Sequence, residues 1–299
     1  MKKLIFRLVM TLVTVVLITV VLSAVYMKSL EKYALDSSGM PEVITVANTG
    51  NSHGLHAFDY SSLPGGFNFA LGSQPLQYDA SLIERYIDRF SEDATLFIPL
   101  SYMSFWGDPT EDEQYEALAM RYMGLLDADG LVLKNRTDYF ILKYFSVIRW
   151  GDVQTHSIFA QKSDRVVNAS ESGLSLEELG ARRAAYHAAL AVQDGELLPM
   201  HEPSLDSVRK MVALCRENGV TPVFITTPYT RAYSGGMPEM LLKSFYEAVN
   251  SLSEELSVPY FDYSRDSRFA DSMFEDSDHL NAQGAAIFMQ IVSEEILSK

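Results

Sequence analysis

The pattern of apolar positions predicts one long hydrophobic helix followed by alternating strands and helices. From Leu8 to Met27 the chain runs 20 residues without a charge. At 1.5 Å per residue this is about 30 Å of helix, which matches the hydrocarbon core of a bilayer. Short β-branched apolar runs come next and end in turn-forming residues, as buried strands do. We expect strands at residues 43–47, 67–71, 95–98, 223–227 and 258–262.

Apolar residues at helical spacing separate these strands. They predict helices at about 82–90, 205–215, 240–256 and 282–297. Asp79 or Ser81 is placed to cap the first of them, and Gly219 follows the second where a helix commonly stops. Short strands alternating with amphipathic helices predict an α/β fold, a three-layer sandwich whose mostly parallel sheet is covered on both faces.

Residues 102–200 interrupt the alternation and predict an inserted, mainly helical cap, because a hundred residues are too many for an ordinary connection. We therefore expect a cytoplasmic tip and anchor at 1–27, a tether at 28–41 and an α/β domain at 42–299 that contains this cap. The apolar run 139–150 has two interpretations. It is a buried part of the cap, or a surface that docks on the membrane interface or on a membrane partner.

The charge is distributed unevenly between the apolar segment and the rest of the chain. The sequence of 299 residues has a net charge of −15. Residues 1–32 hold five basic side chains against one acidic, a balance of +4, which leaves −19 for the remainder. A surface this acidic argues against binding to nucleic acid. The single cysteine, Cys215, excludes an intrachain disulfide framework and a multi-cysteine metal site.

Basic residues set the expected membrane orientation. Lys2, Lys3 and Arg7 precede the apolar run, so the positive-inside rule keeps the amino terminus in the cytoplasm and places the acidic domain outside. A cleaved signal peptide is the alternative, but its apolar core is usually roughly 7–15 residues long. The longer run at residues 8–27 favours a retained single-pass anchor in the cell membrane.

Two polar segments lie at opposite ends of the predicted domain. Gly50-Asn51-Ser52-His53 directly follows the first buried strand, which places Ser52 at the carboxyl edge of a parallel sheet, where ligands collect. Asp276-Ser277-Asp278-His279 precedes the last helix. Residues three apart in a turn can face the same side, so Asp276 could orient the ring of His279. His279 would then take the proton of Ser52, as activation of a hydroxyl nucleophile requires.

These segments resemble motifs of the SGNH/GDSL hydrolase superfamily, in which a Ser follows the first strand and a DxxH lies near the carboxyl terminus. The phrase at residues 68–75, Asn-Phe-Ala-Leu-Gly-Ser-Gln-Pro, is similar to the second block of that family. The resemblance implies an SGNH or flavodoxin-like fold and a triad of Ser52, His279 and Asp276. It also implies that Ser73 and Gln74 help to bind the oxyanion and the substrate.

One departure from the family pattern concerns the oxyanion hole. The third block of the family supplies an Asn after the third strand, whereas this chain reads Ile-Pro-Leu-Ser-Tyr at residues 98–102. The hydroxyl of Ser101 could substitute, or backbone groups at Ser52 and Ser73 could suffice. Losing one oxyanion donor costs about 10²–10³ in rate in a serine protease. The departure therefore puts efficient hydrolysis in doubt rather than the fold.

An anchored domain with GxSH in place of GDSL resembles the branch that acts in D-alanylation of teichoic acids and in O-acetylation of exopolysaccharides. The resemblance implies extracytoplasmic acyl transfer to an envelope glycan or polymer, beside a multispanning membrane-bound O-acyltransferase. Two other functions remain open at this point. One is an esterase that removes acyl groups from envelope glycans with the same residues, and the other is a catalytically idle binding domain.

The remaining candidate residues carry weaker signals. His53 and His56 lie three apart, but no third ligand follows at a recognisable spacing, so we expect no metal and place His53 beside the site. Arg231 follows a strand at the same sheet edge as Ser52, where it could face an anionic substrate group or form a surface salt bridge. No glycine-rich phosphate loop is present in the sequence, and we expect no cofactor.

Overall fold

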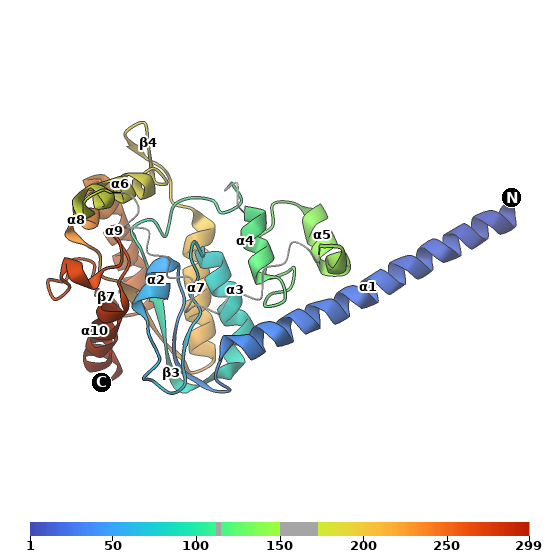
Figure 1. Ribbon diagram of the computed structural model, residues 1–299, viewed down its shortest axis with the longest axis horizontal. Helices are drawn as coiled ribbons and strands as arrows, with labels where there is room; N and C mark the ends of the chain where they lie inside the picture. Colours follow the sequence, from blue (N-terminus) through green and yellow to red (C-terminus); the bar gives the residue numbers. More distant parts are fainter. Residues whose placement is uncertain (112–114, 150–172, 299) are drawn as a thin grey trace. The chain divides into compact units, whose positions relative to one another are not determined.

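The described residues form two compact units. The computed structural model describes residues 1–111, 115–149 and 173–298 (Figure 1). Residues 1–40 and 109–149 make up one unit, which we call the anchor unit. Residues 41–108 and 173–298 make up the second, which we call the sheet unit. Residues 150–172 of the expected cap lie outside the described part of the chain.

The sheet unit is built on a five-stranded parallel sheet, which confirms the predicted fold class. Its strands lie in the order β2-β1-β3-β6-β7, and every neighbouring pair is parallel. The strands are β1 (Ile44–Asn48), β2 (Gly66–Asn68), β3 (Phe90–Pro99), β6 (Thr221–Thr226) and β7 (Tyr260–Asp262). By order of appearance this is 2-1-3-4-5, the flavodoxin-like order, whose switch point lies between β1 and β3.

Helices cover both faces of this sheet (Figure 1). On one face α2 and α10 pack together over alternate sheet residues, among them Val46, Phe97 and Ile225. On the other face α3 packs against α7. The helices of the unit are α2 (Ser52–Ala57), α3 (Leu76–Tyr86), α6 (Leu176–Ala188), α7 (Glu202–Glu217), α8 (Arg231–Gly235), α9 (Glu239–Leu256) and α10 (Ala282–Val292), with short turns η1 (Ile87–Arg89), η4 (Asp271–Met273) and η5 (Ser293–Leu297).

The loops after β1 and β3 meet at the switch point. Thr49 donates its backbone N–H to the carbonyl of Phe97 at 3.1 Å, which continues the pairing of the two strands past the end of β1. Gly50 follows with φ +116°, and a Cβ there would approach the ring of Pro99 within 3.3 Å. Only glycine suits both the left-handed backbone and this close approach. The chain can therefore turn directly from β1 into α2.

The anchor unit consists of one long helix with three short helical segments. α1 (Lys2–Ser38) is 37 residues long, and among the described residues it is the one helix long and apolar enough to cross a membrane. The other segments are α4 (Tyr115–Tyr122), α5 (Arg136–Phe145) and η2 (Ser146–Arg149). α5 and η2 pack against α1. The α5 helix begins at Asn135, whose side chain accepts hydrogen bonds from the amides of Thr137 and Asp138.

Three local features differ from the sequence expectations. Residues 28–38, expected as part of a tether, continue α1 until Gly39 ends it in the left-handed conformation. The expected helical cap contains a two-stranded antiparallel hairpin, β4 (Val192–Gln193) and β5 (Glu196–Leu197). Helix α3 begins at Leu76, so Asp79 lies inside the helix and does not cap it.

Candidate active site

Ser52 and His279, 227 residues apart in the chain, meet at the carboxyl edge of the sheet. Ser52 is the first residue of α2 and is half-buried. Its Oγ lies 2.8 Å from Nε2 of His279. Residues 273–281, which carry the histidine, form a closed loop, because Asn281 donates its backbone N–H to the carbonyl of Met273 at 2.9 Å. The hydroxyl and the imidazole are thus within proton-transfer reach in the folded chain.

Asp276 fixes the orientation of the His279 ring. Its carboxylate oxygens lie 2.8 and 3.0 Å from Nδ1 of His279. One of these oxygens also accepts the backbone N–H groups of Asp278 at 3.0 Å and of His279 at 2.9 Å. A carboxylate against Nδ1 favours the tautomer with a proton on that nitrogen, which leaves Nε2 free to accept the proton of Ser52. The arrangement is that of a nucleophile, a base and an orienting acid.

Opposing effects set the pKa of His279. Burial alone lowers the pKa of this ring, but the hydrogen bond that it donates to Asp276 and the negative charges of Asp278 and Asp276 outweigh burial, so the pKa is raised above its usual value. The pKa of the Asp276 carboxyl is lowered: burial raises it, and the hydrogen bond and charge of His279 more than compensate. A raised pKa makes His279 a stronger base and extends the pH range in which it is protonated.

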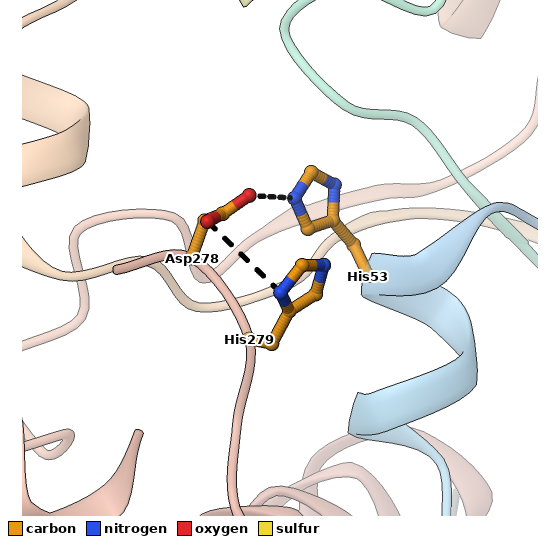
Figure 2. A group of neighbouring side chains, drawn as sticks. All are labelled: His53, Asp278 and His279. Carbon is orange, nitrogen blue, oxygen red and sulfur yellow. Dashed lines mark hydrogen bonds and ion pairs between the residues drawn. The ribbon is translucent and has the colours of Figure 1, made fainter. Parts of the chain in front are cut away.

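A second histidine–carboxylate pair, His53 and Asp278, lies beside His279 (Figure 2). Nε2 of His53 is 3.0 Å from Oδ2 of Asp278, and both side chains are buried. The other oxygen of Asp278 accepts the hydroxyl of Ser277 at 2.9 Å and lies 3.3 Å from Nε of Arg183 on α6. It is also 4.0 Å from Nδ1 of His279. These neighbours lower the pKa of the Asp278 carboxyl despite its burial, so it is ionised beside the triad.

His53, Asp278 and His279 also form the one group of potential metal ligands among the described residues. Their ligand atoms lie within 4.8 Å of one another. However, the two ring nitrogens of His279 already face Ser52 and Asp276. An ion held by His279 would therefore compete with the proposed triad, and the arrangement fits proton transfer better than metal binding. The pKa of His53 is lowered by burial, although its bond to Asp278 opposes the shift.

Ser73 and Gln74 lie in the loop that follows β2, next to the loop of Ser52. Leu71 of this loop donates its backbone N–H to the carbonyl of Gly50 at 3.1 Å. Ser73 is exposed and adopts the left-handed conformation, with φ 60°. The side chain of Gln74 is buried, and its Nε2 donates to Asp79 and to the carbonyl of Phe69. The loop that carries Ser73 is thus bonded to the loop of Ser52 through Leu71, whereas Gln74 stabilises the loop from within.

Asp79, on helix α3, links the loop of Gly50 to the loop of Gln74 through hydrogen bonds. Its Oδ1 accepts the backbone N–H of Gly50 at 2.9 Å as well as the amide of Gln74. Burial raises the pKa of this carboxyl to about 7, and the two hydrogen bonds only partly oppose the shift. The expectation that Asp79 caps a helix missed this role, because contacts between residues 29 positions apart leave no local signal.

Ser101 contacts the loop of Ser52 through Asn51, and Arg231 lies on an exposed helix turn. The Oγ of Ser101 accepts a hydrogen bond from Nδ2 of Asn51 at 3.2 Å, so Ser101 acts on the nucleophile loop through Asn51. Arg231 is exposed at the first turn of α8 and makes no ion pair with the triad among the described residues. Its neighbour Thr230 is buried, and its hydroxyl donates to the carbonyl of Ser277. The sheet edge at 230–231 therefore positions the Asp278 turn.

Comparisons with known proteins find solved structures of low similarity. No family model and no curated protein matches this sequence. A solved structure from Bacteroides fragilis, described as "a putative acylhydrolase", is 12% identical with a TM-score of 0.42 and covers 89% of this chain and 94% of its own. The protein YXIM of Bacillus subtilis is 11% identical with a TM-score of 0.37, covering 86% of this chain and 56% of its own. At this similarity neither structure establishes fold or activity, and the fold rests on the sheet order described above.

Proposed function

We propose that the sheet unit carries out serine-dependent acyl-ester chemistry. The observation that supports this function is the relay from Ser52 Oγ to His279 Nε2 at 2.8 Å and from His279 Nδ1 to Asp276 at 2.8 Å. Ser52 would attack the carbonyl carbon of an acyl donor while its proton passes to His279. The imidazolium would then return that proton to the leaving group, which leaves an acyl-serine. An acceptor hydroxyl would release the acyl group by the reverse sequence.

The developing oxyanion needs donors that this chain supplies from its backbone. The amide of Ser52, in the first turn of α2, is among the N–H groups that a helix leaves without an intrahelical acceptor. Ser73 lies in the loop bonded to Gly50 and has a left-handed backbone. We assign the amides of Ser52 and Ser73 to the oxyanion hole. The side chain of Asn51, directly before Ser52, donates to Oγ of Ser101, which lies in the stretch where the family pattern has its third-block Asn.

The acyl acceptor in this proposal is a hydroxyl group of a cell-envelope glycan or polymer. The GxSH and DxxH motifs, the acidic domain and the α1 helix, whose long uncharged stretch follows three basic residues, support this choice. In this arrangement α1 anchors the chain in the cell membrane, its amino terminus is cytoplasmic and the sheet unit is outside. A multispanning membrane-bound O-acyltransferase would deliver the acyl group. Hydrolysis is the second candidate, favoured by the partial exposure of Ser52, which lets water reach an acyl-serine.

A fluorophosphonate probe tests the nucleophile. The full chain in detergent is labelled beside Ser52→Ala, His279→Ala and Ser62→Ala, the last replacing an exposed serine in the next turn. We expect an adduct in the wild type and in Ser62→Ala, and loss of that adduct in the other two variants. Labelling that survives Ser52→Ala would contradict the proposal, as would the absence of any adduct in the wild type.

Acyl-group partition distinguishes transfer from hydrolysis. The full chain is given p-nitrophenyl acetate with and without an oligosaccharide acceptor, and both free acetate and acetylated sugar are quantified. Transfer predicts that added acceptor diverts acetyl groups from water to sugar in a manner that requires Ser52. Release of acetate that is unchanged by any acceptor would favour the esterase.

A further inference from the structure

The strongest feature outside the active site is a stripe of exposed apolar side chains in the anchor unit. Phe140, Tyr144 and Ile148 are 54%, 40% and 61% exposed. They recur every four residues along α5 and η2, so they share one face of this helical segment. Leu142 and Ser146, which lie on the opposite face, are buried. One face of the segment therefore packs inside the unit, whereas a second, apolar face is left exposed by the residues that the structure describes.

The contact between η2 and α1 fixes the position of these exposed side chains along the axis of α1. Val147 donates its backbone N–H to Oγ of Ser23 at 3.2 Å, and Oγ of Ser146 donates to the carbonyl of Ser23 at 3.4 Å. Ser23 is 1% exposed, although most of its neighbours in the apolar stretch of α1 are exposed. Because Met27 is the last residue before the charged part of α1, Ser23 lies four positions inside the uncharged stretch, about 6 Å along the axis.

A second contact fixes the anchor unit further along α1. Gly124, with φ +97°, lies so close to α1 that a Cβ at this position would be 2.5 Å from Cβ of Leu30. Leu30 belongs to the charged part of the helix, beyond Met27. The unit thus contacts α1 on both sides of the boundary between its charged and uncharged parts. The Gly124 contact lies on the charged side, and the η2 contact lies on the uncharged side.

We infer that α5 and η2 are immersed in the interfacial layer of the bilayer that α1 spans, with Phe140, Tyr144 and Ile148 in contact with lipid. A segment packed on Ser23 must share the depth of Ser23, and the side chains exposed at that depth meet acyl chains and headgroups rather than water. Tyrosine is typical of this layer. Lys143, which pairs with Asp129 at 2.7 Å, and Arg149, whose NH2 lies 3.9 Å from Glu116, have long side chains that reach the headgroups. This inference rests on the membrane-spanning role proposed for α1.

Depth-resolved fluorescence of the full chain tests the inference. Single-cysteine variants Phe140→Cys, Tyr144→Cys and Ile148→Cys carry an environment-sensitive dye in nanodiscs of phosphatidylcholine and phosphatidylglycerol. Cys215 stays in place, because it is buried and burial raises the pKa of its thiol to about 12, which suppresses labelling. Leu17→Cys, at the middle of the apolar stretch, reports on α1 itself. Lys243→Cys on α9 provides an exposed polar position in the sheet unit.

We expect blue-shifted emission and strong quenching by lipids spin-labelled near the headgroup at positions 140, 144 and 148. Position 17 should be quenched best by lipids labelled deep in the acyl chain, and position 243 by neither. Quenching at 17 without quenching at 140, 144 and 148 would overturn the inference while leaving the anchor in place. Absence of quenching at 17 would overturn the anchor and the inference together, and leaves the Ser52 labelling experiment unaffected.

Discussion

Asp278 pairs with Nε2 of His53 at 3.0 Å and does not take the orienting position on the histidine that faces Ser52. That position belongs to Asp276. The turn between residues 276 and 279 therefore provides one carboxylate for each of two neighbouring histidines: Asp276 contacts His279, and Asp278 contacts His53. Because only the His279 ring contacts the serine hydroxyl, the two carboxylates have separable roles: Asp276 holds the base, and Asp278 tunes it through its charge.

Neutralising each carboxylate should separate these roles. Asp276→Asn removes the negative charge and replaces one oxygen facing Nδ1 with an amide NH2, which disfavours the tautomer with a proton on Nδ1. The change should lower kcat by about 10⁴-fold, the loss found for the equivalent change in a serine protease. Asp278→Asn keeps the Asp276–His279 pair and should cost much less when assayed at a pH above the His279 pKa. Hydrolysis of p-nitrophenyl acetate measures both. Equal losses in the two variants would show that the carboxylates act as one unit.

The pH profile follows from the raised pKa of His279. Since the imidazole must be neutral to accept the serine proton, kcat/KM should rise with pH through a midpoint above the usual value of 6.5. The charge of Asp278 contributes to that rise, so Asp278→Asn should move the midpoint to lower pH. Initial rates between pH 5 and 9, with a stability check at each pH, provide the measurement. A midpoint that stays fixed in Asp278→Asn would show that this charge does not reach the base.

Asp79 should make the folded chain less stable as the pH rises. Its pKa is about 7 in the folded chain against an ordinary value of 3.8, so the native state holds a proton that the unfolded state has lost between these values. The associated stability is present below pH 3.8 and is lost by the time the pH passes 7, on the order of 4 kcal/mol. Asp79→Asn should remove this dependence of stability on pH, because an amide does not ionise. The amide oxygen can still accept the backbone N–H of Gly50, so the fold should be retained. Denaturant unfolding at pH 5 and pH 8 measures it.

The exposed Asp88, just beyond the end of α3, provides the matched control for this measurement. Asp88→Asn should leave the difference in unfolding free energy between pH 5 and pH 8 as it is in the wild type. If the difference in unfolding free energy between pH 5 and pH 8 is the same in Asp79→Asn as in the wild type, Asp79 is already ionised in the folded chain at pH 5. Its pKa would then not be raised by burial.

Gly284 should be intolerant of any side chain. A Cβ at this position of α10 would lie 2.3 Å from the carbonyl oxygen of Met273, at the base of the loop that carries Asp276 and His279. Gly284→Ala should lower the free energy of unfolding by roughly 1–3 kcal/mol and displace the triad loop. Gly235→Ala, where the added Cβ meets no atom within 4 Å, is the control. Full stability and activity of Gly284→Ala would show that the loop adjusts without cost.

The apolar pattern was sufficient to predict the layered parallel sheet, because β1, β3 and β6 contain β-branched apolar runs that are followed by turn residues. The pattern was less informative about where α1 ends. Residues 28–38 contain charges that suggested a tether, but they lack Gly and Pro, and the stop signal is Gly39. The β4–β5 hairpin has a local signal that was overlooked: Asp194-Gly195, both with positive φ, form the turn expected between paired strands.

In the candidate site, residues within local motifs could be predicted from the sequence, whereas contacts between distant segments could not. Ser52, Asp276 and His279 could be proposed because each lies in a short motif next to an apolar run. The part played by Asp278 was not foreseen, although the residue stands inside the motif, because its partner His53 is 225 positions away. Arg183 had no local signal, since only the folded chain brings α6 to Asp278. Such residues become visible only when the sheet places distant loops together.

The distance along the chain between Ser52 and its base has a consequence for biosynthesis. The hydroxyl is made early, whereas the imidazole that would activate it follows 227 residues later. A chain that is synthesised stepwise would therefore hold an inert alcohol until helix α10 packs against α2. Polypeptides that lack residue 279 would be harmless to esters in their surroundings, and reactivity would itself report that the two distant loops have come together.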